Sequence, residues 1–202
     1  MIHTLLLDAD GVVQRFDPAT WSAIVAMTPR SDKQGFVTAI MDAERPCLSG
    51  LSAFPVAFAR VLEDWECHAS PEEGMRLWNE VQTDSGVLDI VSSVRRLGIR
   101  CCLASNQQPA RALHMSTVLG YAEVFDREFY SHELGIAKPD VAYFATILQS
   151  LAEPANAVLF VDDNAQNVEA AASLGIHAEC FPANSGAATL QRLLGKYGVS
   201  VA

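Results

Sequence analysis

The chain has 202 residues, half of them hydrophobic, and a formal net charge of −10 at pH 7. A chain of this length and apolar content can form a full core in one domain, with a smaller insert beside it. The negative charge argues against nucleic acids and anionic membranes as partners, because nothing would offset the repulsion of their phosphates. A small phosphorylated metabolite is compatible with the charge if its site supplies local cations.

The five cysteines are an odd number without the paired spacing of a metal site, which indicates reduced thiols in a reducing compartment. The N-terminus lacks a basic segment and Asp8 interrupts its apolar run, so we expect no secretory signal. No stretch is apolar for long enough to span a bilayer. These features predict a cytoplasmic protein, and we expect a monomer or a homodimer.

The first apolar run, residues 2–7, predicts a buried strand that leads into the sequence DADGVV. Side chains two apart on a strand share a face, so Asp8 and Asp10 leave its end in the same direction. Gly11 then allows a sharp turn. Two neighbouring carboxylates repel each other unless a cation lies between them or one takes a proton. The stretch fits a Mg²⁺ site or a proton-transfer pair, and equally the ordinary polar end of a strand.

The next seventy residues show only helical patterns. Helices are expected over 18–27, 33–44, 53–66 and 71–81, because apolar residues recur there at helical spacing. Each is preceded by a residue that can cap a helix N-terminus; these are Asp17, Ser31 or Asp32, Ser52 and Ser70. The segment 15–85 is therefore expected to be an all-helical unit without a strand.

From residue 86 onward, helices and strands alternate. Helices are expected over 87–97, 109–119, 141–151, 165–174 and 187–197, and strands over 99–104, 128–131, 157–161 and 176–181. This alternation predicts an α/β fold with a doubly wound parallel sheet covered by helices on both faces. We divide the chain into an α/β core, residues 1–14 and 86–202, and a helical insert, residues 15–85.

Polar residues follow each predicted core strand, and parallel strands bring their carboxyl ends to one edge of the sheet. Besides Asp8 and Asp10, these residues are Ser105, Asn106, Lys138, Asp162, Asp163 and Asn167. Each has an ordinary explanation as a helix cap or an exposed lysine. Gathered at one edge, however, the four acids require a cation.

The stretches DADGVV, LASNQ, GIAKPD and LFVDDNAQN occur here in the order found in the haloacid dehalogenase-like hydrolase superfamily. The chain resembles this family over essentially its whole length. The resemblance implies a Rossmann-like core with a small helical cap inserted after strand one, similar to the cap of the sugar-phosphatase-like branch. It also implies Mg²⁺ as the cofactor and a reaction through an aspartyl-phosphate.

Carried onto this sequence, the resemblance implies that Asp8 is the nucleophile that attacks phosphorus. Asp10 would protonate the leaving oxygen and later activate water. Ser105 and the backbone N–H of Asn106 would hold phosphate oxygens. Lys138 would neutralise both the nucleophile and the phosphoryl group.

The implied metal ligands are Asp8, Asp163 and the main-chain carbonyl of Asp10. Asp162 would stand behind them and orient Lys138. Asn167 occupies a position where many family members carry Asp, which leaves its share in the metal site open. The chemistry is consistent, because Mg²⁺ and an ammonium offset the repulsion between a carboxylate and a phosphate, and Mg²⁺ favours a few carboxylates with water and substrate phosphate.

The expected function is hydrolysis of a phosphomonoester of a small metabolite. A phosphomutase or phosphotransferase would use the same residues, whereas a dehalogenase of the family lacks the acid at Asp10. A phospho-accepting receiver domain has its acid pair after the first strand and its lysine after the last. Here the pair Asp162–Asp163 comes after Lys138, which disfavours a receiver. The intact acids and lysine disfavour a non-catalytic binding protein. Substrate contacts are expected on the insert and on the loop after Asp10, where the candidates are Gln14, Arg15, Phe16, Trp21 and Arg45.

Overall fold

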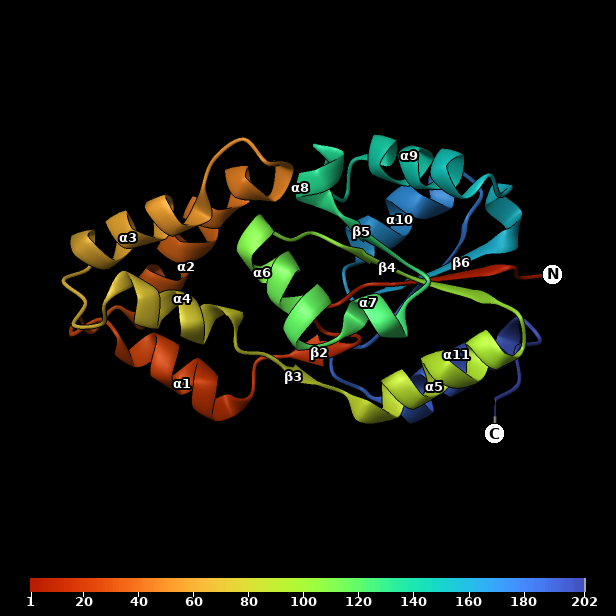
Figure 1. The fold of residues 1–202 in the computed structure, drawn as a ribbon, viewed down its shortest axis with the longest axis horizontal. Helices are drawn as coiled ribbons and strands as arrows, with labels where there is room; N and C mark the ends of the chain where they lie inside the picture. The colour runs from red at the N-terminus through yellow and green to blue at the C-terminus, as the bar shows by residue number, and fades with distance from the viewer. Residues whose placement is uncertain (202) are drawn as a thin grey trace.

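A computed structural model describes residues 1–201 and contains a five-stranded parallel sheet in the order β5-β4-β1-β6-β7 (Figure 1). The strands are β1 (Thr4–Leu7), β4 (Arg100–Ser105), β5 (Arg127–Tyr130), β6 (Val158–Asp162) and β7 (His177–Cys180). β1 lies in the middle and pairs with β4 and β6. Its four residues are all buried, as a central strand covered on both faces requires. The predicted fold class is confirmed.

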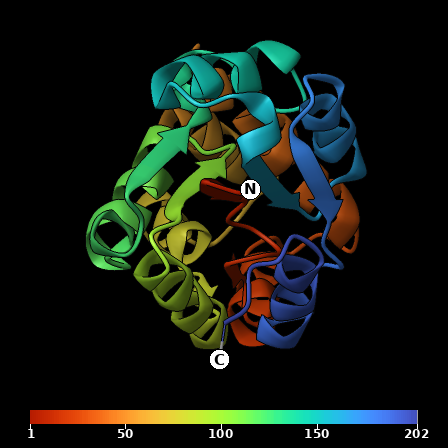
Figure 2. The same ribbon diagram turned by 90° about the vertical axis from the view of Figure 1, so that its right-hand side faces the viewer.

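Helices cover both faces of the sheet (Figures 1 and 2). One face carries α5 (Ser85–Arg96), α6 (Pro109–Leu113), α7 (Tyr121–Val124) and α11 (Ala187–Lys196), and the other carries α9 (Val141–Leu151) and α10 (Ala165–Ser173). Because side chains alternate along a strand, Leu5 and Leu7 join the hydrophobic cluster of the first face and Leu6 joins that of the second.

A separate group of helices lies beyond the carboxyl end of β1 (Figure 1). It consists of α1 (Pro18–Ala26), α2 (Lys33–Glu44), the 3-10 helix η1 (Arg45–Ser49), α3 (Phe54–Asp64) and α4 (Pro71–Asn79), and we call it the helical unit. It has a hydrophobic cluster of its own, which includes Phe36, Phe54, Phe58 and Trp78. The unit touches the core where η1 packs against α8 (Ser131–Leu134).

Three of the predicted N-caps are present, since Asp17, Asp32 and Ser70 each accept a backbone N–H of the helix that follows. The prediction of Ser52 as a cap is wrong. α3 begins after Ala53 without a side-chain cap, and the Ser52 hydroxyl lies 3.1 Å from the thiol of Cys47. Pro55 at the start of α3 removes one of the N–H groups that a cap would satisfy.

The segment 15–85 is not free of strands, contrary to the prediction. β2 (Gln14–Arg15) and β3 (Gln82–Thr83) form an antiparallel ribbon at the two ends of the helical unit. Two residues per strand are too few to produce a period in the sequence, and the pairing joins residues far apart in the chain. The ribbon continues into the core, where the N–H of Asp84 donates to the carbonyl of Val13.

Other differences concern short elements. The helix expected over 109–119 is divided into α6, which ends at Leu113, and a π-helical turn over His114–Val118 that follows it directly. α7 and α8 are single helical turns. Such turns depend on tertiary packing more than on periodicity. Elsewhere the ends differ by a few residues, as fraying helix ends do.

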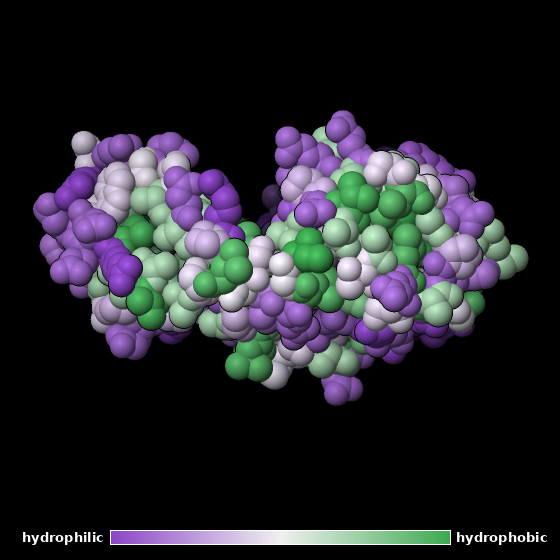
Figure 3. Space-filling model, turned by 90° about the horizontal axis from the view of Figure 1, so that it is seen from above, coloured by the Kyte–Doolittle hydropathy of each residue, from purple (hydrophilic) through white to green (hydrophobic). Residues whose placement is uncertain are grey.

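Seen from above, the helical unit and the core form two lobes with a hollow between them (Figure 3). Within residues 1–201, no helix has the length and apolar character needed to cross a membrane.

Two helical glycines should respond oppositely to alanine. At Gly74 in α4, a Cβ would lie 2.6 Å from the ring of Phe58, whereas at Gly195 in α11 nothing lies within 4 Å. We expect Gly195→Ala to stabilise the fold by about 0.5–1 kcal/mol through helix propensity. We expect Gly74→Ala to destabilise it, because overpacking costs about 1–3 kcal/mol. Denaturant unfolding checks both, and stabilisation by Gly74→Ala would mean that Phe58 moves freely.

Candidate active site

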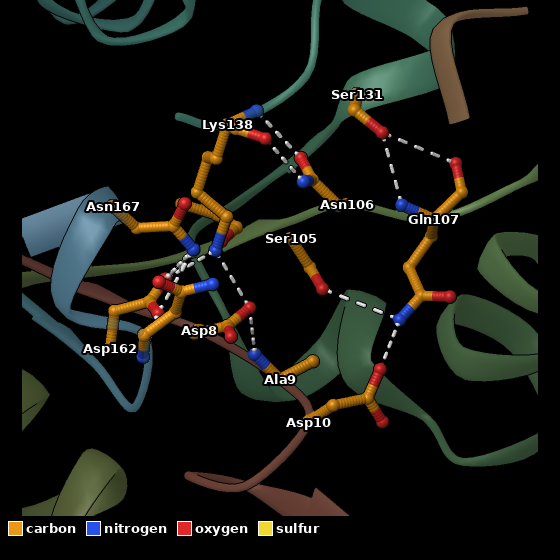
Figure 4. Close-up of polar contacts among 12 residues, drawn as sticks. Asp8, Ala9, Asp10, Ser105, Asn106, Gln107, Ser131, Lys138, Asp162 and Asn167 are labelled. Carbon is orange, nitrogen blue, oxygen red and sulfur yellow. Dashed lines mark hydrogen bonds and ion pairs between the residues drawn. The ribbon is translucent and has the colours of Figure 1, made fainter. Parts of the chain in front are cut away.

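The centre of the site is the ammonium of Lys138, which the structure places between two carboxylates (Figure 4). Its Nζ lies 2.8 Å from Asp8 Oδ1 and 2.6 Å from Asp162 Oδ2, and it donates to the carbonyl of Ala104 at 2.8 Å. The Lys138 side chain is 1% exposed. All three of its donors are therefore used, and each partner comes from the end of a different central strand or the residue after it.

Burial and charge act against each other in this group. Burial raises the pKa of the Asp8 carboxyl, and the Lys138 ammonium offsets part of that rise. Burial alone would lower the pKa of Lys138, but the carboxylates of Asp8 and Asp162 raise it above its ordinary value. We infer an ion pair, because an unpaired charge at this depth would be strongly unfavourable.

Asp162 has no oxygen free for a ligand. Besides Lys138, it accepts the backbone N–H of Asn164 at 2.8 Å, and the side-chain amide of Asn167 donates to both of its oxygens at 3.0 Å. Asp162 thus stands behind Lys138. Asn167 holds Asp162 in place through its amide Nδ2. This nitrogen is a hydrogen-bond donor and is not a metal ligand.

The loops that carry Lys138 and Ser105 are tied together by Asn106. Its side chain donates to the Lys138 carbonyl and accepts the Lys138 N–H, both at 2.8 Å. The side chain of Asn106 is therefore structural, which leaves its backbone N–H for a ligand. Ser105 is buried at the end of β4, and its hydroxyl accepts a long bond of 3.4 Å from Gln107.

Asp163 and Asp8 offer oxygen atoms to a cation. Ligand atoms of Asp8, Asp162 and Asp163 lie within 4.8 Å of one another. Among residues 1–201, no side chain donates a hydrogen bond to Asp8 Oδ2 or to the Asp163 carboxylate. Burial and the charge of Asp162 raise the pKa of Asp163. Hard oxygen ligands with excess negative charge fit Mg²⁺.

Gly11 is required beside this carboxylate. It adopts φ +80°, and a Cβ on it would lie 2.2 Å from Asp163 Oδ2. Any other residue would be strained in its backbone and would displace Asp163.

Asp10 lies in a different environment from Asp8. Gln107 Nε2 donates to its Oδ2 at 2.7 Å, while Arg111 and Gln14 donate to its Oδ1 at 2.9 and 3.0 Å. Tyr121 in turn donates to the Gln14 amide oxygen at 3.0 Å. We call Gln14, Gln107 and Arg111 the donor clamp of Asp10.

These residues open into one cleft of about 700 Å³ between the sheet and the helical unit. Its inner end contains the acids, Ser105, Asn106 and Lys138. Its outer end is lined by residues of the ribbon, the helical unit and α6; these are Arg15, Phe16, Pro18, Trp21, Met41, Glu44, Trp78 and Arg111.

A sequence model of the haloacid dehalogenase-like hydrolases matches residues 2–175. The chain belongs to this family.

Solved structures of family members share the fold. The HAD family enzyme bt-2542 from Bacteroides thetaiotaomicron is 21% identical with a TM-score of 0.76, over 91% of this chain and 95% of that one. A HAD-like family hydrolase from Porphyromonas gingivalis is 19% identical with a TM-score of 0.78, and the match covers 96% of this chain and 98% of that one. An L-2-haloacid dehalogenase from Xanthobacter autotrophicus is 17% identical with a TM-score of 0.69, and the match covers 99% of this chain and 85% of that one.

One curated relative matches a short segment. The drimenol cyclase drtB of Aspergillus calidoustus is 42% identical over 67 residues, which are 32% of this chain and 13% of that protein. The bt-2542 enzyme has been solved with magnesium and inorganic phosphate, in the wild-type form at 20% identity.

The structure of this HAD-like hydrolase brings together all eight residues predicted for the site. The outer cleft agrees less well with expectation. Arg15, Phe16 and Trp21 line it, but Gln14 is buried against Asp10, and Arg45 pairs with Asp42 at the surface, with its side chain 75% exposed. Glu44, Trp78 and Arg111 also line the cleft and were not predicted, because a single polar or aromatic residue within a helix belongs to no motif.

The metal assignment can be tested without turnover. At about 100 times its dissociation constant, Mg²⁺ should stabilise the folded wild type by about 2.7 kcal/mol. Asp163→Asn should reduce this gain at the same Mg²⁺ concentration. Without metal, the variant should be at least as stable as the wild type. The raised pKa of the Asp163 carboxyl in the wild type means that its negative charge is unfavourable in the folded protein.

Thermal unfolding with and without Mg²⁺ measures both effects. Asp64→Asn, at an exposed position of α3, is the matched control and should keep the full gain. An equal Mg²⁺ effect in Asp163→Asn and wild type would remove Asp163 from the ligand set.

Proposed function

We propose that the chain is a Mg²⁺-dependent phosphomonoesterase that acts on a small phosphorylated metabolite through an aspartyl-phosphate on Asp8. The observation that carries the proposal is the pair of carboxylates, Asp8 and Asp10, which line one cleft in different environments. Asp8 is buried against an ammonium, and Asp10 is held by neutral amides and a guanidinium. A nucleophile and a proton donor are what two-step ester hydrolysis needs.

In the first step, Asp8 attacks phosphorus while the bond from phosphorus to the leaving oxygen breaks. Asp10 gives its proton to that oxygen, so the leaving group departs as a neutral alcohol. Lys138 stabilises charge on the nucleophile and the phosphoryl group, in a site too buried for water to screen it. Ser105 and the N–H of Asn106 hold phosphoryl oxygens.

In the second step, Asp10 takes a proton from water as the water attacks phosphorus. The bond between phosphorus and Asp8 breaks, which releases inorganic phosphate and restores the carboxylate. Asp8 and Asp163 would hold Mg²⁺ with the carbonyl of Asp10, and the ion would neutralise the transferring phosphoryl group. Asp162, held by Asn167, keeps Lys138 in place through both steps.

Asp10 also favours phosphoryl transfer over attack on carbon, the chemistry of the dehalogenase branch. The helical unit beside the cleft supports hydrolysis of small esters, because a lid there would exclude bulk water and large substrates. A phosphotransferase would share every residue named here and differ only in its acceptor.

Asp8→Asn should abolish turnover of small phosphate esters while the protein remains folded. An amide has nearly the same shape as the carboxylate but cannot form the acyl-phosphate. Steady-state hydrolysis of a phosphate ester panel, together with the unfolding midpoint of the variant, measures both properties. Turnover near the wild-type rate would exclude Asp8 as the nucleophile.

The donor clamp supports the assignment of Asp10 in a testable way. Arg111 is buried and reaches Asp10 from α6, so it is a positioning residue that acts through Asp10. An alkyl phosphate needs a proton on its leaving oxygen, whereas a dinitrophenyl phosphate leaves without one. Arg111→Gln should therefore lower kcat/KM for the alkyl ester by about 100-fold and change the aryl ester only a few-fold.

Arg111→Lys, which keeps a cation at this position, should recover part of the alkyl ester activity. Equal losses on the two esters would show that Arg111 is needed only for the fold.

A further inference from the structure

The outer end of the cleft has an aromatic wall. Phe16 is at its centre, with ring centroids 5.6 Å from Trp21 and 5.5 Å from Trp78, and all three residues line the cleft. The guanidinium of Arg111 lies 4.7 Å above the Phe16 ring. The faces of such rings carry negative electrostatic potential and attract cations.

Glu44 lies in this wall, at the last residue of α2. Its Oε1 accepts the indole N–H of Trp78 at 2.9 Å. Burial raises the pKa of Glu44, and the nearby charge of Arg111 and the bond from Trp78 oppose that rise. In its ionised form, a carboxylate in this environment needs a partner of opposite charge.

No residue in the described part of the chain supplies that partner. No basic nitrogen there lies within 4.0 Å of the Glu44 carboxylate. Arg111, the cation that influences it most, bonds Asp10 at 2.9 Å through one guanidinium nitrogen and makes no ion pair with Glu44. Arg15 faces Asp84 at 3.8 Å. Among the charged residues of the outer cleft lining in the described part of the chain, Glu44 is thus the one without an ion pair, and it lies beside three aromatic rings.

We propose that Glu44 and the Phe16–Trp21–Trp78 wall bind an ammonium group on the leaving group, so that the substrate is the phosphate monoester of an amino alcohol. The proposal rests on the phosphomonoesterase function proposed above. An ammonium would neutralise Glu44 and lie against the ring faces. A second anionic group would be repelled by Glu44, and a neutral hydroxyl would leave the charge uncompensated.

The test compares three short series of esters, namely ω-aminoalkyl, ω-hydroxyalkyl and n-alkyl phosphates of matched chain length. In the wild type, kcat/KM for the best aminoalkyl ester should exceed that for its alkyl counterpart by about 10–100-fold, as expected for a charge-assisted contact. Glu44→Gln should remove this preference, so that the aminoalkyl and alkyl esters have similar kcat/KM values in the variant.

Asp42→Asn is the matched control, because Asp42 lies on the same helix with its side chain 55% exposed and outside the cleft lining. It should keep the preference. Equal rates for aminoalkyl and alkyl esters in the wild type would overturn the proposal. A preference for hydroxyalkyl esters would also overturn it, since Glu44 would then bind a neutral donor.

Binding separates this proposal from the proposed function. Calorimetry on the Asp8→Asn variant of the 202-residue chain should show tighter binding of the aminoalkyl phosphate than of the alkyl phosphate, and adding Glu44→Gln should abolish the difference. If no ester is turned over but this difference is present, the hydrolase assignment fails and the ammonium subsite stands. No difference in binding overturns the subsite.

Discussion

The ammonium of Lys138, enclosed by Asp8 and Asp162, fixes the geometry of the strand ends. A buried ion that loses its partner is destabilising by about 3–5 kcal/mol, so the three groups hold one another in place. Asp8 follows β1, Asp162 ends β6, and the third acceptor of Lys138 lies on β4. The same contacts that align three strands therefore align the nucleophile, and a change that loosens this corner of the fold also misplaces Asp8.

The two acids of the DADG sequence lie two residues apart and occupy unlike surroundings. Asp8 is buried and faces the Lys138 ammonium, which offsets part of the rise that burial causes in its pKa. Asp10 is partly exposed and accepts hydrogen bonds from Gln14 in the ribbon, Gln107 in the loop after β4 and Arg111 in α6. Different environments commonly assign different roles to paired carboxylates. Because Gln14 belongs to both the clamp and the ribbon, the base of the helical unit is joined to Asp10.

The elements that leave a periodic pattern or an ordered motif in the sequence were predictable. The elements that form through contacts between distant parts of the chain were not. Alternation of strand and helix predicted the parallel sheet, and the order of its polar strand ends predicted the inner site around Lys138. Nothing local marks the ribbon at Gln14–Arg15, which exists only because Gln82–Thr83 returns to it. Glu44 and Arg111 were missed for the same reason, since their importance comes from neighbours far away in the chain.

The position of β1 in the sheet has a consequence for how the chain matures on the ribosome. β1 emerges before both of its partners, which begin only at Arg100 and Val158. The helical unit, by contrast, needs nothing outside residues 16–79 for its own apolar cluster. Contacts that are local in sequence form sooner than those that close long loops. The insert can thus condense while the central strand still lacks neighbours, and the acids at the end of that strand meet their lysine only after residue 138 has emerged.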